Sequence, residues 1–312
     1  MVIIKGVCMK RVEKNKKTIA YLLIFFVVII WGITPLLNVV INKKYSTALR
    51  LSVSGFISAI VLTFFCVKKL KNLNKSYFFV AVPTGFFLAL ASLLQKIGLY
   101  YTTPTKYAFL ENLSCLTVPI ILLIALKKKP KIFSILSCVL CLIGSFILSG
   151  MSFSAEGISF GKGELLCALA GVLYGVNIAF TGIHIKKFDT MLYLLVQLYS
   201  TAIFGLIFAI ATSFIKINGV PIEVIRFSWD FSGLALLLCV AVISNLLCWY
   251  LRTYATRFVG PIAVSVIMPF SAVVTGIASV LSGLDVINGE LIFGGLITLF
   301  AILLSSIADI KG

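Results

Sequence analysis

Three charged residues lie inside long apolar segments of this 312-residue chain: Arg50, Lys96 and Glu111. A charge at the centre of a bilayer costs about 2.5–3.5 kcal/mol, so each of them needs a partner or a function. Lys96 precedes the turn at Thr103–Pro104 by seven residues, and Glu111 follows that turn by seven. At about 1.5 Å per helical residue, both lie roughly 11 Å from the turn. We predict an intramembrane Lys96–Glu111 pair that lines a cavity. A structural ion pair and a snorkelling lysine are the alternatives.

Arg50 and Glu111 also have individual interpretations. Arg50 lies about one turn into its apolar segment, so it either snorkels toward the membrane surface or holds a substrate carboxylate with its two-pronged guanidinium. Glu111 is the best candidate for coupling transport to protons, because it is the carboxylate best embedded in the apolar segments.

Polar and aromatic residues recur at helical spacing in four apolar segments. Side chains three, four or seven residues apart share one helix face. A small-molecule pocket combines aromatic walls with a few polar anchors, so we expect Trp31, Asn38, Tyr174, Asn177, Gln197, Asn245 and Trp249 to bind substrate together with the three charged residues. The alternative is helix–helix hydrogen bonding and interfacial aromatics. The full stripes are Trp31–Pro35–Asn38, Tyr174–Asn177–Thr181, Tyr193–Gln197–Ser200 and Asn245–Trp249–Arg252.

Composition places these segments in lipid. The chain is 61% hydrophobic, its charged residues make up 12%, and its mean hydropathy is +1.13. A soluble chain of this length has no room to bury so much apolar surface. The predicted fold class is therefore an all-α membrane protein with ten transmembrane helices, since each run is about 20 residues long. The predicted spans are 18–40, 47–66, 77–98, 104–125, 132–151, 164–184, 190–214, 231–251, 258–282 and 289–308.

Local signals mark where some of these helices start and bend. Thr103 is a good N-cap, with Pro104 at the first helical position, and Gly260–Pro261 marks another start. We expect kinks at the prolines inside spans, which are Pro35, Pro119 and Pro269.

The basic residues predict an orientation. The formal net charge is +17, but the lysines occur in short runs between apolar segments. Such runs match anionic lipid headgroups and argue against nucleic acid. With a cytoplasmic N-terminus, nineteen of the 27 Lys and Arg residues fall on the inside and six on the outside. We therefore expect an integral protein of the plasma (inner) membrane with both termini cytoplasmic. The first apolar run is too long for a signal-peptide core.

The chain also contains an internal repeat. In the first half, Trp31–Gly32 is followed by Lys43–Lys44–Tyr45–Ser46–Thr47. In the second half, Tyr174–Gly175 is followed at the same spacing by Lys186–Lys187–Phe188–Asp189–Thr190, so corresponding residues are 143 positions apart. Five helices per half make the second copy inverted, which permits alternating access around a central site. The expected parts are a basic cytoplasmic tail (1–17), two five-helix repeats (18–151 and 164–308), an external connector (152–163) and a cytoplasmic C-terminus (309–312).

The stretch from Gly98 to Pro119, GLYYTTPTKYAFLENLSCLTVP, resembles the third-to-fourth helix region of EamA-type permeases of the drug/metabolite transporter superfamily. Trp31–Gly32, Arg50 and Gly294–Gly295 are similar to that family as well. The chain departs from the family at two points. The family often has Gly-Glu just after helices 4 and 9, where the nearest residues here are Lys128 and Asp285. The family also often has Glu before the second proline, where Met268 precedes Pro269 here. The resemblance implies a ten-helix transporter without naming its substrate, because the family moves amino acids, sugars, amines and other metabolites.

We expect a secondary transporter, an exporter or exchanger, of a small metabolite such as an amino acid or amine. A flippase of a lipid-linked substrate and a non-transporting receptor or scaffold are the alternatives. An intramembrane enzyme is disfavoured by the single histidine, His184, at a helix end. We expect no cofactor. ATP drive by this chain is disfavoured because no P-loop pattern is present, and no metal is expected because Cys138 and Cys141 suit packing. The oligomeric state stays open.

Overall fold

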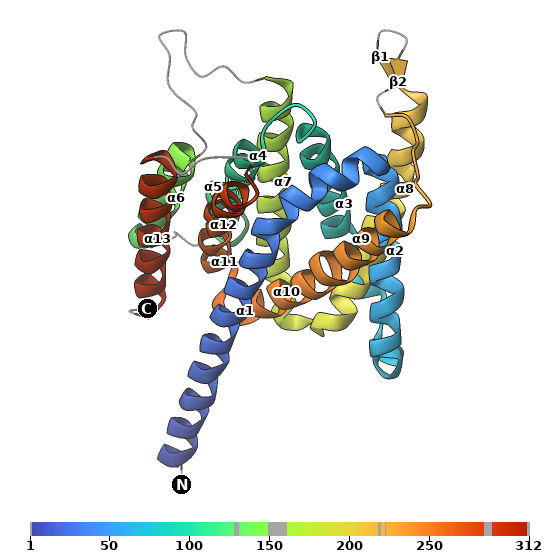
Figure 1. The fold of residues 1–312 in the computed structure, drawn as a ribbon. Coiled ribbons are helices and arrows are strands. Elements are labelled where there is room, and N and C mark those ends of the chain that lie inside the picture. The colour runs from blue at the N-terminus through green and yellow to red at the C-terminus, as the bar shows by residue number, and fades with distance from the viewer. Residues whose placement is uncertain are drawn as a thin grey trace.

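A computed structural model of the chain describes residues 2–127, 131–148, 161–217, 220–221, 223–283 and 289–310. These residues form a helical bundle with one short antiparallel hairpin (Figure 1). The first half contains α1 (Val2–Lys44), α2 (Thr47–Cys66), η1 (Val67–Asn72), α3 (Lys75–Gly98), α4 (Pro104–Glu111), α5 (Ser114–Leu126) and α6 (Ile132–Leu148). The second contains α7 (Lys162–His184), η2 (Ile185–Lys187), α8 (Thr190–Phe214), β1 (Lys216–Ile217), β2 (Val220–Pro221), α9 (Phe231–Cys239), η3 (Val240–Leu247), α10 (Cys248–Val259), α11 (Pro261–Ile267), α12 (Phe270–Leu281) and α13 (Gly289–Ile310).

The helical fold class is confirmed, and eight helical segments in the described residues are long and apolar enough to cross a membrane. The other two predicted spans coincide with α6 and α13, whose apolar parts, Ile132–Ile147 and Gly289–Ser305, are shorter. The inverted arrangement of ten spans therefore stays a prediction. The connector 152–163 lies mainly outside the described residues, as do Lys128 and Asp285.

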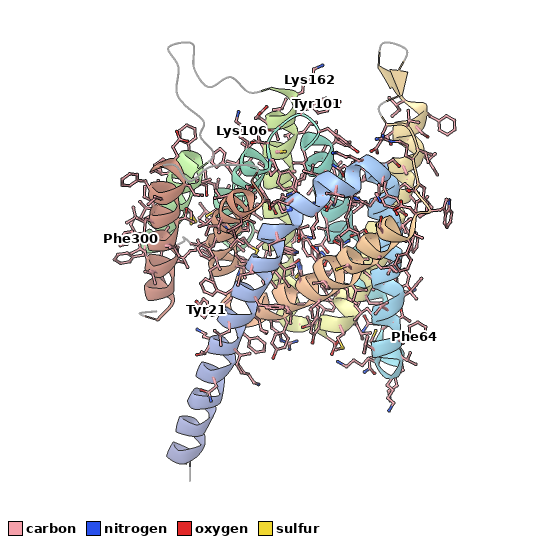
Figure 2. The ribbon with its side chains drawn as sticks, in the orientation of Figure 1. Tyr21, Phe64, Tyr101, Lys106, Lys162 and Phe300 are labelled. Atoms are coloured by element: carbon pink, nitrogen blue, oxygen red, sulfur yellow. The ribbon has the colours of Figure 1, made fainter. Side chains whose placement is uncertain are left out.

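The outer surface of the bundle is apolar, as lipid requires. Phe64 is 77% exposed and Phe300 is 59% exposed, and both lie at the periphery of the bundle (Figure 2). Lys106 and Lys162 lie together at one end. The first residue of α1 and the last residues of α13 lie toward the opposite end (Figure 1).

The two halves are packed against each other through α2 on α8, α3 on α7 and α8, and α1 on α10 and α12. Small residues allow the close approach, as is usual between membrane helices. At Gly85 of α3, an added Cβ would lie 2.8 Å from the carbonyl oxygen of Gln197 on α8. Any larger residue there would push these two helices apart.

Two of the spans are broken at matching points. Thr103 caps α4 by accepting a hydrogen bond from the Lys106 amide, with Pro104 in the first turn, as predicted. α4 ends at Glu111 and α5 begins at Ser114. In the second half α11 begins at Pro261 after Gly260, whose φ is 85°, again as predicted.

In the second broken span, α11 ends at Ile267 and α12 begins at Phe270. Pro269 lies in this break, where it lacks the N–H that would continue the α-helical pattern. Pro35 and Pro119, by contrast, lie within the continuous helices α1 and α5.

Candidate functional site

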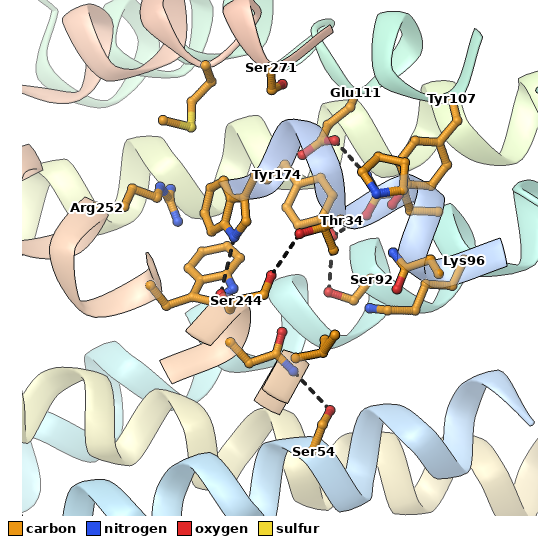
Figure 3. Close-up of a pocket in the computed structure, with 18 of the residues that line it drawn as sticks. Thr34, Ser54, Ser92, Lys96, Tyr107, Glu111, Tyr174, Ser244, Arg252 and Ser271 are labelled. Atoms are coloured by element: carbon orange, nitrogen blue, oxygen red, sulfur yellow. Dashed lines mark hydrogen bonds between the residues drawn. The ribbon is translucent and has the colours of Figure 1, made fainter. Parts of the chain in front are cut away.

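A cavity lies in the middle of the bundle (Figure 3). Every broken span and both halves contribute to it. Its lining residues are Trp31, Thr34, Pro35 and Asn38 of α1; Arg50 and Ser54 of α2; Ser92, Gln95 and Lys96 of α3; Tyr107 and Glu111 of α4; Asn112 and Ser114; Tyr174 and Ile178 of α7; Leu237 of α9; Val240, Ser244 and Asn245 of η3; Trp249 and Arg252 of α10; and Met268 and Ser271.

Eight of the ten predicted binding residues line this cavity: Trp31, Asn38, Arg50, Lys96, Glu111, Tyr174, Asn245 and Trp249. Asn177 and Gln197 do not. Asn177 is fully buried and accepts a hydrogen bond from Arg252, while Gln197 of α8 is 1% exposed. The Gln197 stripe faces neighbouring helices because α8 packs against both α2 and α3.

Glu111 is held by a chain of hydrogen bonds from three helices. Gln95 Nε2 donates to Glu111 Oε2 at 2.7 Å, and the Tyr174 hydroxyl donates to Gln95 Oε1 at 2.6 Å. Ser92 Oγ lies 3.1 Å from the same hydroxyl. This chain fixes both the carboxylate and the phenol that faces the cavity.

The predicted Lys96–Glu111 ion pair is absent between these two described residues, although both line the cavity. Successive residues on a helix point about 100° apart, since one turn takes 3.6 residues. α3 therefore presents only one of two adjacent side chains to Glu111, and Gln95 takes that position. The depth argument was right, and the choice of partner was wrong.

The two arginines that line the cavity, Arg50 and Arg252, are buried, so Arg50 does not snorkel to the surface. Arg50 is 2% exposed, and its Nη1 donates to Asn38 Oδ1 at 3.2 Å. Arg252 is also 2% exposed and donates to Asn177 Oδ1 from both terminal nitrogens, at 3.2 and 3.3 Å. Its guanidinium carbon lies 4.5 Å from the ring centroid of Trp249, a cation–π contact.

The stripes of the first and sixth predicted spans do contribute one aromatic wall. The ring centroids of Trp31 and Trp249 are 5.0 Å apart, and Tyr174 stacks on Trp249 at 6.4 Å. Trp31 comes from α1, Tyr174 from α7 and Trp249 from α10. Aromatic faces from both halves thus meet at the cavity.

A π-helical stretch, η3, supplies Asn245, which periodicity found, and two backbone acceptors that periodicity did not find. Its wider turn disturbs the regular backbone pairing, and two of its carbonyl oxygens accept hydrogen bonds from other helices. Trp31 Nε1 donates to the Ser244 carbonyl at 3.1 Å, and Ser58 Oγ donates to the Ala241 carbonyl at 2.8 Å. The residue spacing of this segment does not predict the π turn.

Other lining residues were also missed or left out of the predicted binding set. Gln95 directly precedes Lys96, Tyr107 lies one helical turn before Glu111, and Arg252 belonged to a recognised stripe. Ser92 and Ser114 have no signal of their own, because serines are common throughout the apolar segments. Among the described residues there is no cluster of three or more His, Cys, Asp or Glu side chains for a metal.

Comparisons with known proteins agree with this architecture. The model of the EamA-like transporter family matches residues 18–150 and 161–307. A solved chain described as "Crystal structure of protein" superimposes with a TM-score of 0.73 at 12% sequence identity, over 94% of this chain and 98% of that one. That likeness concerns the fold alone. No curated protein matches the sequence. Because the two matched segments span almost the whole chain, the protein belongs to the EamA-like transporter family.

Proposed function

We propose that the chain is a secondary transporter that carries a small metabolite, such as an amino acid, through the central cavity. The observation that carries this proposal is the cavity itself, because residues from both family-matched segments line it in mid-bundle. It combines aromatic walls with buried polar anchors, as a small-molecule site requires. An amine alone suits it less, because three of the four charged side chains that line the cavity are cations.

The packing supports an inverted repeat. α1 packs on α10 and α12, and its counterpart α7 packs on α3, α4 and α5. α2 packs on its own counterpart α8, and α6 packs on α13. A two-fold axis in the membrane plane generates this pattern of pairs, and broken helices beside a central site are typical of such transporters.

Two ion pairs at opposite ends of α2 support alternating access. Lys44 Nζ lies 2.5 Å from Asp230 Oδ2, and Lys69 Nζ lies 2.8 Å from Asp189 Oδ2. α2 has 20 residues, so the two pairs are about 30 Å apart. Each joins the first half to the second at one face. Partly exposed ion pairs contribute about 0–1 kcal/mol, so either tie opens easily.

The orientation follows from the charge bias. The chain ends that lie on one face in Figure 1 belong to the side with most Lys and Arg residues, which is cytoplasmic in inner-membrane proteins. On this proposal, Lys69 and Asp189 close the cytoplasmic face, and Lys44 and Asp230 close the outer face.

Reconstitution tests the proposal. The purified chain in liposomes should exchange at least one labelled amino acid or related small metabolite with saturable kinetics. Ser244→Trp, which fills the cavity, should abolish this exchange. Phe214→Trp, at a position 79% exposed to lipid, should leave it intact. Exchange that survives Ser244→Trp in a folded, monodisperse protein would place the pathway elsewhere.

A further inference from the structure

The charges that line the cavity do not balance. Three lining side chains are cations, Arg50, Lys96 and Arg252, and one is a carboxylate, Glu111. Two positive charges are therefore in excess in a region surrounded by apolar helices. Buried charges without partners are costly, so natural sites supply a counter-charge. None of the other described lining residues supplies it.

Two of these four groups are already satisfied by the protein. Arg252 binds Asn177 and stacks on Trp249, and Asn177 is itself fixed by donating to the Thr84 carbonyl at 2.9 Å. Glu111 accepts the hydrogen bond from Gln95. Figure 3 shows Arg252 and Lys96 on opposite sides of the cavity. Arg252 therefore lies apart from Lys96.

Arg50 and Lys96 are the groups left over. Arg50 Nη1 is held by Asn38, while its Nη2 is buried without any hydrogen-bond partner. Lys96 Nζ has no hydrogen-bond or ion-pair partner among the described residues; its charge is repelled by Arg50 and attracted by Glu111 at longer range. Tyr107, a residue that is 4% exposed, lines the same cavity and carries a hydroxyl group. An anion between these groups would satisfy all of them.

We propose that Arg50 and Lys96 form an anion subsite that binds the carboxylate or phosphate group of the transported molecule. This proposal rests on the proposed function and narrows its substrate class. Asn38 holds Nη1 of the guanidinium and leaves Nη2 free to donate to the ligand. The remainder of the molecule would lie against Trp31, Tyr174 and Trp249. A simple amine is excluded, because it would add a positive charge to two that are already unpaired.

The first test needs no ligand. Lys96→Gln removes a charge that is only partly exposed and has no ion-pair partner among the described residues, so the ligand-free variant should melt at the same temperature as the unmodified chain or higher. If Lys96 instead served a structural ion pair, the same variant would melt lower, because its partner would lose its counter-charge. Lys106→Gln is the matched control. It makes the same charge change at the end of α4, where Lys106 lies 3.9 Å from Glu164.

The second test measures binding in neutral-lipid nanodiscs at constant ionic strength. The probes are sodium glutarate, inorganic phosphate, sodium chloride and propylammonium chloride, and the readout is the melting temperature. Glutarate or phosphate should raise it in a saturable manner, and propylammonium should not. A response to glutarate alone identifies a carboxylate as the bound group, and a response to phosphate alone identifies a phosphate.

Variants then assign the effect to the subsite. Arg50→Lys and Lys96→Gln should each weaken the apparent anion affinity roughly tenfold or more, as loss of a charge-assisted hydrogen bond does, and Lys106→Gln should not. Equal anion affinity in all four proteins, stabilisation by propylammonium, or a response to chloride equal to that of the organic anions would overturn the proposal. Binding of anions without any transport would reject the proposed function and leave the subsite standing. Transport of an amine without anion binding would do the reverse.

Discussion

Gln95 determines how Glu111 is held, and Gln197 provides its natural comparison. Both amides are buried, at 5% and 1% exposure. Gln95 bonds to a carboxylate and a phenol, whereas neither amide atom of Gln197 has a partner. The two side-chain amides therefore have the same capacity for hydrogen bonds, but only the amide of Gln95 forms them.

This contrast predicts opposite responses to one substitution. Gln95→Leu should lower the free energy of unfolding by about 1–3 kcal/mol, because Glu111 and Tyr174 lose their partner. Gln197→Leu should be neutral or stabilising, because it removes a buried amide whose hydrogen bonds are unmade. Unfolding in detergent, followed by circular dichroism, measures both. A larger loss for Gln197→Leu would contradict the assigned hydrogen bonds.

Glu111→Gln tests the coupling role. If this carboxylate takes up and releases the coupled proton, the amide variant should transport its substrate with a pH dependence that is flattened relative to the unmodified chain. Liposome exchange between pH 5.5 and 8 measures this. Dependence on pH that is unchanged in the variant removes Glu111 as the coupling group.

At this scale the sequence predicted positions better than partners. The depth of Lys96 and Glu111 below the turn at Thr103 follows from helical rise alone, and both line the cavity. Which of two adjacent side chains reaches Glu111 depends on the rotation of α3 against α4 and α7. That rotation is set by packing between segments far apart in the chain, so Gln95 was not chosen.

One side chain, Asp189, fixes the N-terminus of α8. Asp189 caps α8 by accepting hydrogen bonds from the Met191 and Leu192 amides, and it pairs with Lys69. Burial raises the pKa of the Asp189 carboxyl, but the hydrogen bonds from Lys69 and these amides outweigh burial and place the pKa below its ordinary value. Its stabilising effect is complete above the ordinary value near 3.8 and is lost as pH falls through the lower, folded value.

Asp189→Asn separates the charge from the cap, since Asn also caps helices well. The stability difference between the unmodified chain and this variant should be constant above about pH 4.5 and shrink toward pH 3. Melting temperatures across that range measure it. Asp189→Ala should cost about 1 kcal/mol more than Asp189→Asn, because the capping oxygen is lost as well. A difference that grows on acidification would contradict the pairing.

Breaks inside helices were predicted only where a residue type announces them. Gly260–Pro261 and Pro269 mark the ends of α11, and the structure follows them. The break between α4 and α5 has no proline. There the Asn112 side chain donates to Ser145 Oγ at 2.9 Å, a contact with α6 that local sequence does not reveal. The π turn of η3 is likewise fixed by its neighbours.

On the scale of the whole molecule, the two ion-paired ties should respond reciprocally. Lys44→Gln weakens the tie to Asp230, and Lys69→Gln weakens the tie to Asp189. If closure of one face accompanies opening of the other, each variant should speed hydrogen exchange of amides at its own end of α2 and slow it at the opposite end.

Exchange measured by mass spectrometry on the full chain in nanodiscs reads both ends in one experiment. The control is Lys75→Gln, a change of the same charge at an exposed lysine without a resolved ion pair among the described residues. Acceleration at one end with no change at the other would mean that the faces open independently, which contradicts alternating access.

Hydropathy was sufficient to place the spans, because lipid demands long apolar helices wherever the chain crosses. The predicted spans 132–151 and 289–308 coincide with α6 and α13, whose apolar parts are shorter in the described residues, so their crossing stays a prediction. The relation between the halves was read from a few matched residues around Trp31 and Tyr174. Their packing partners, by contrast, emerge only in three dimensions.

The bond between the Trp31 indole and the Ser244 carbonyl has a consequence for biosynthesis, because its two residues are 213 positions apart. At typical ribosomal rates, α1 waits roughly 10–40 s before η3 is made. During the first part of that delay, α7 and α8, which pack on α3 and α2, do not yet exist either, and the Trp31 indole lacks its partner until the delay ends. The nascent first half must therefore persist in the bilayer with unmet polar groups, which makes insertion chaperones and membrane proteases competitors for the same intermediate.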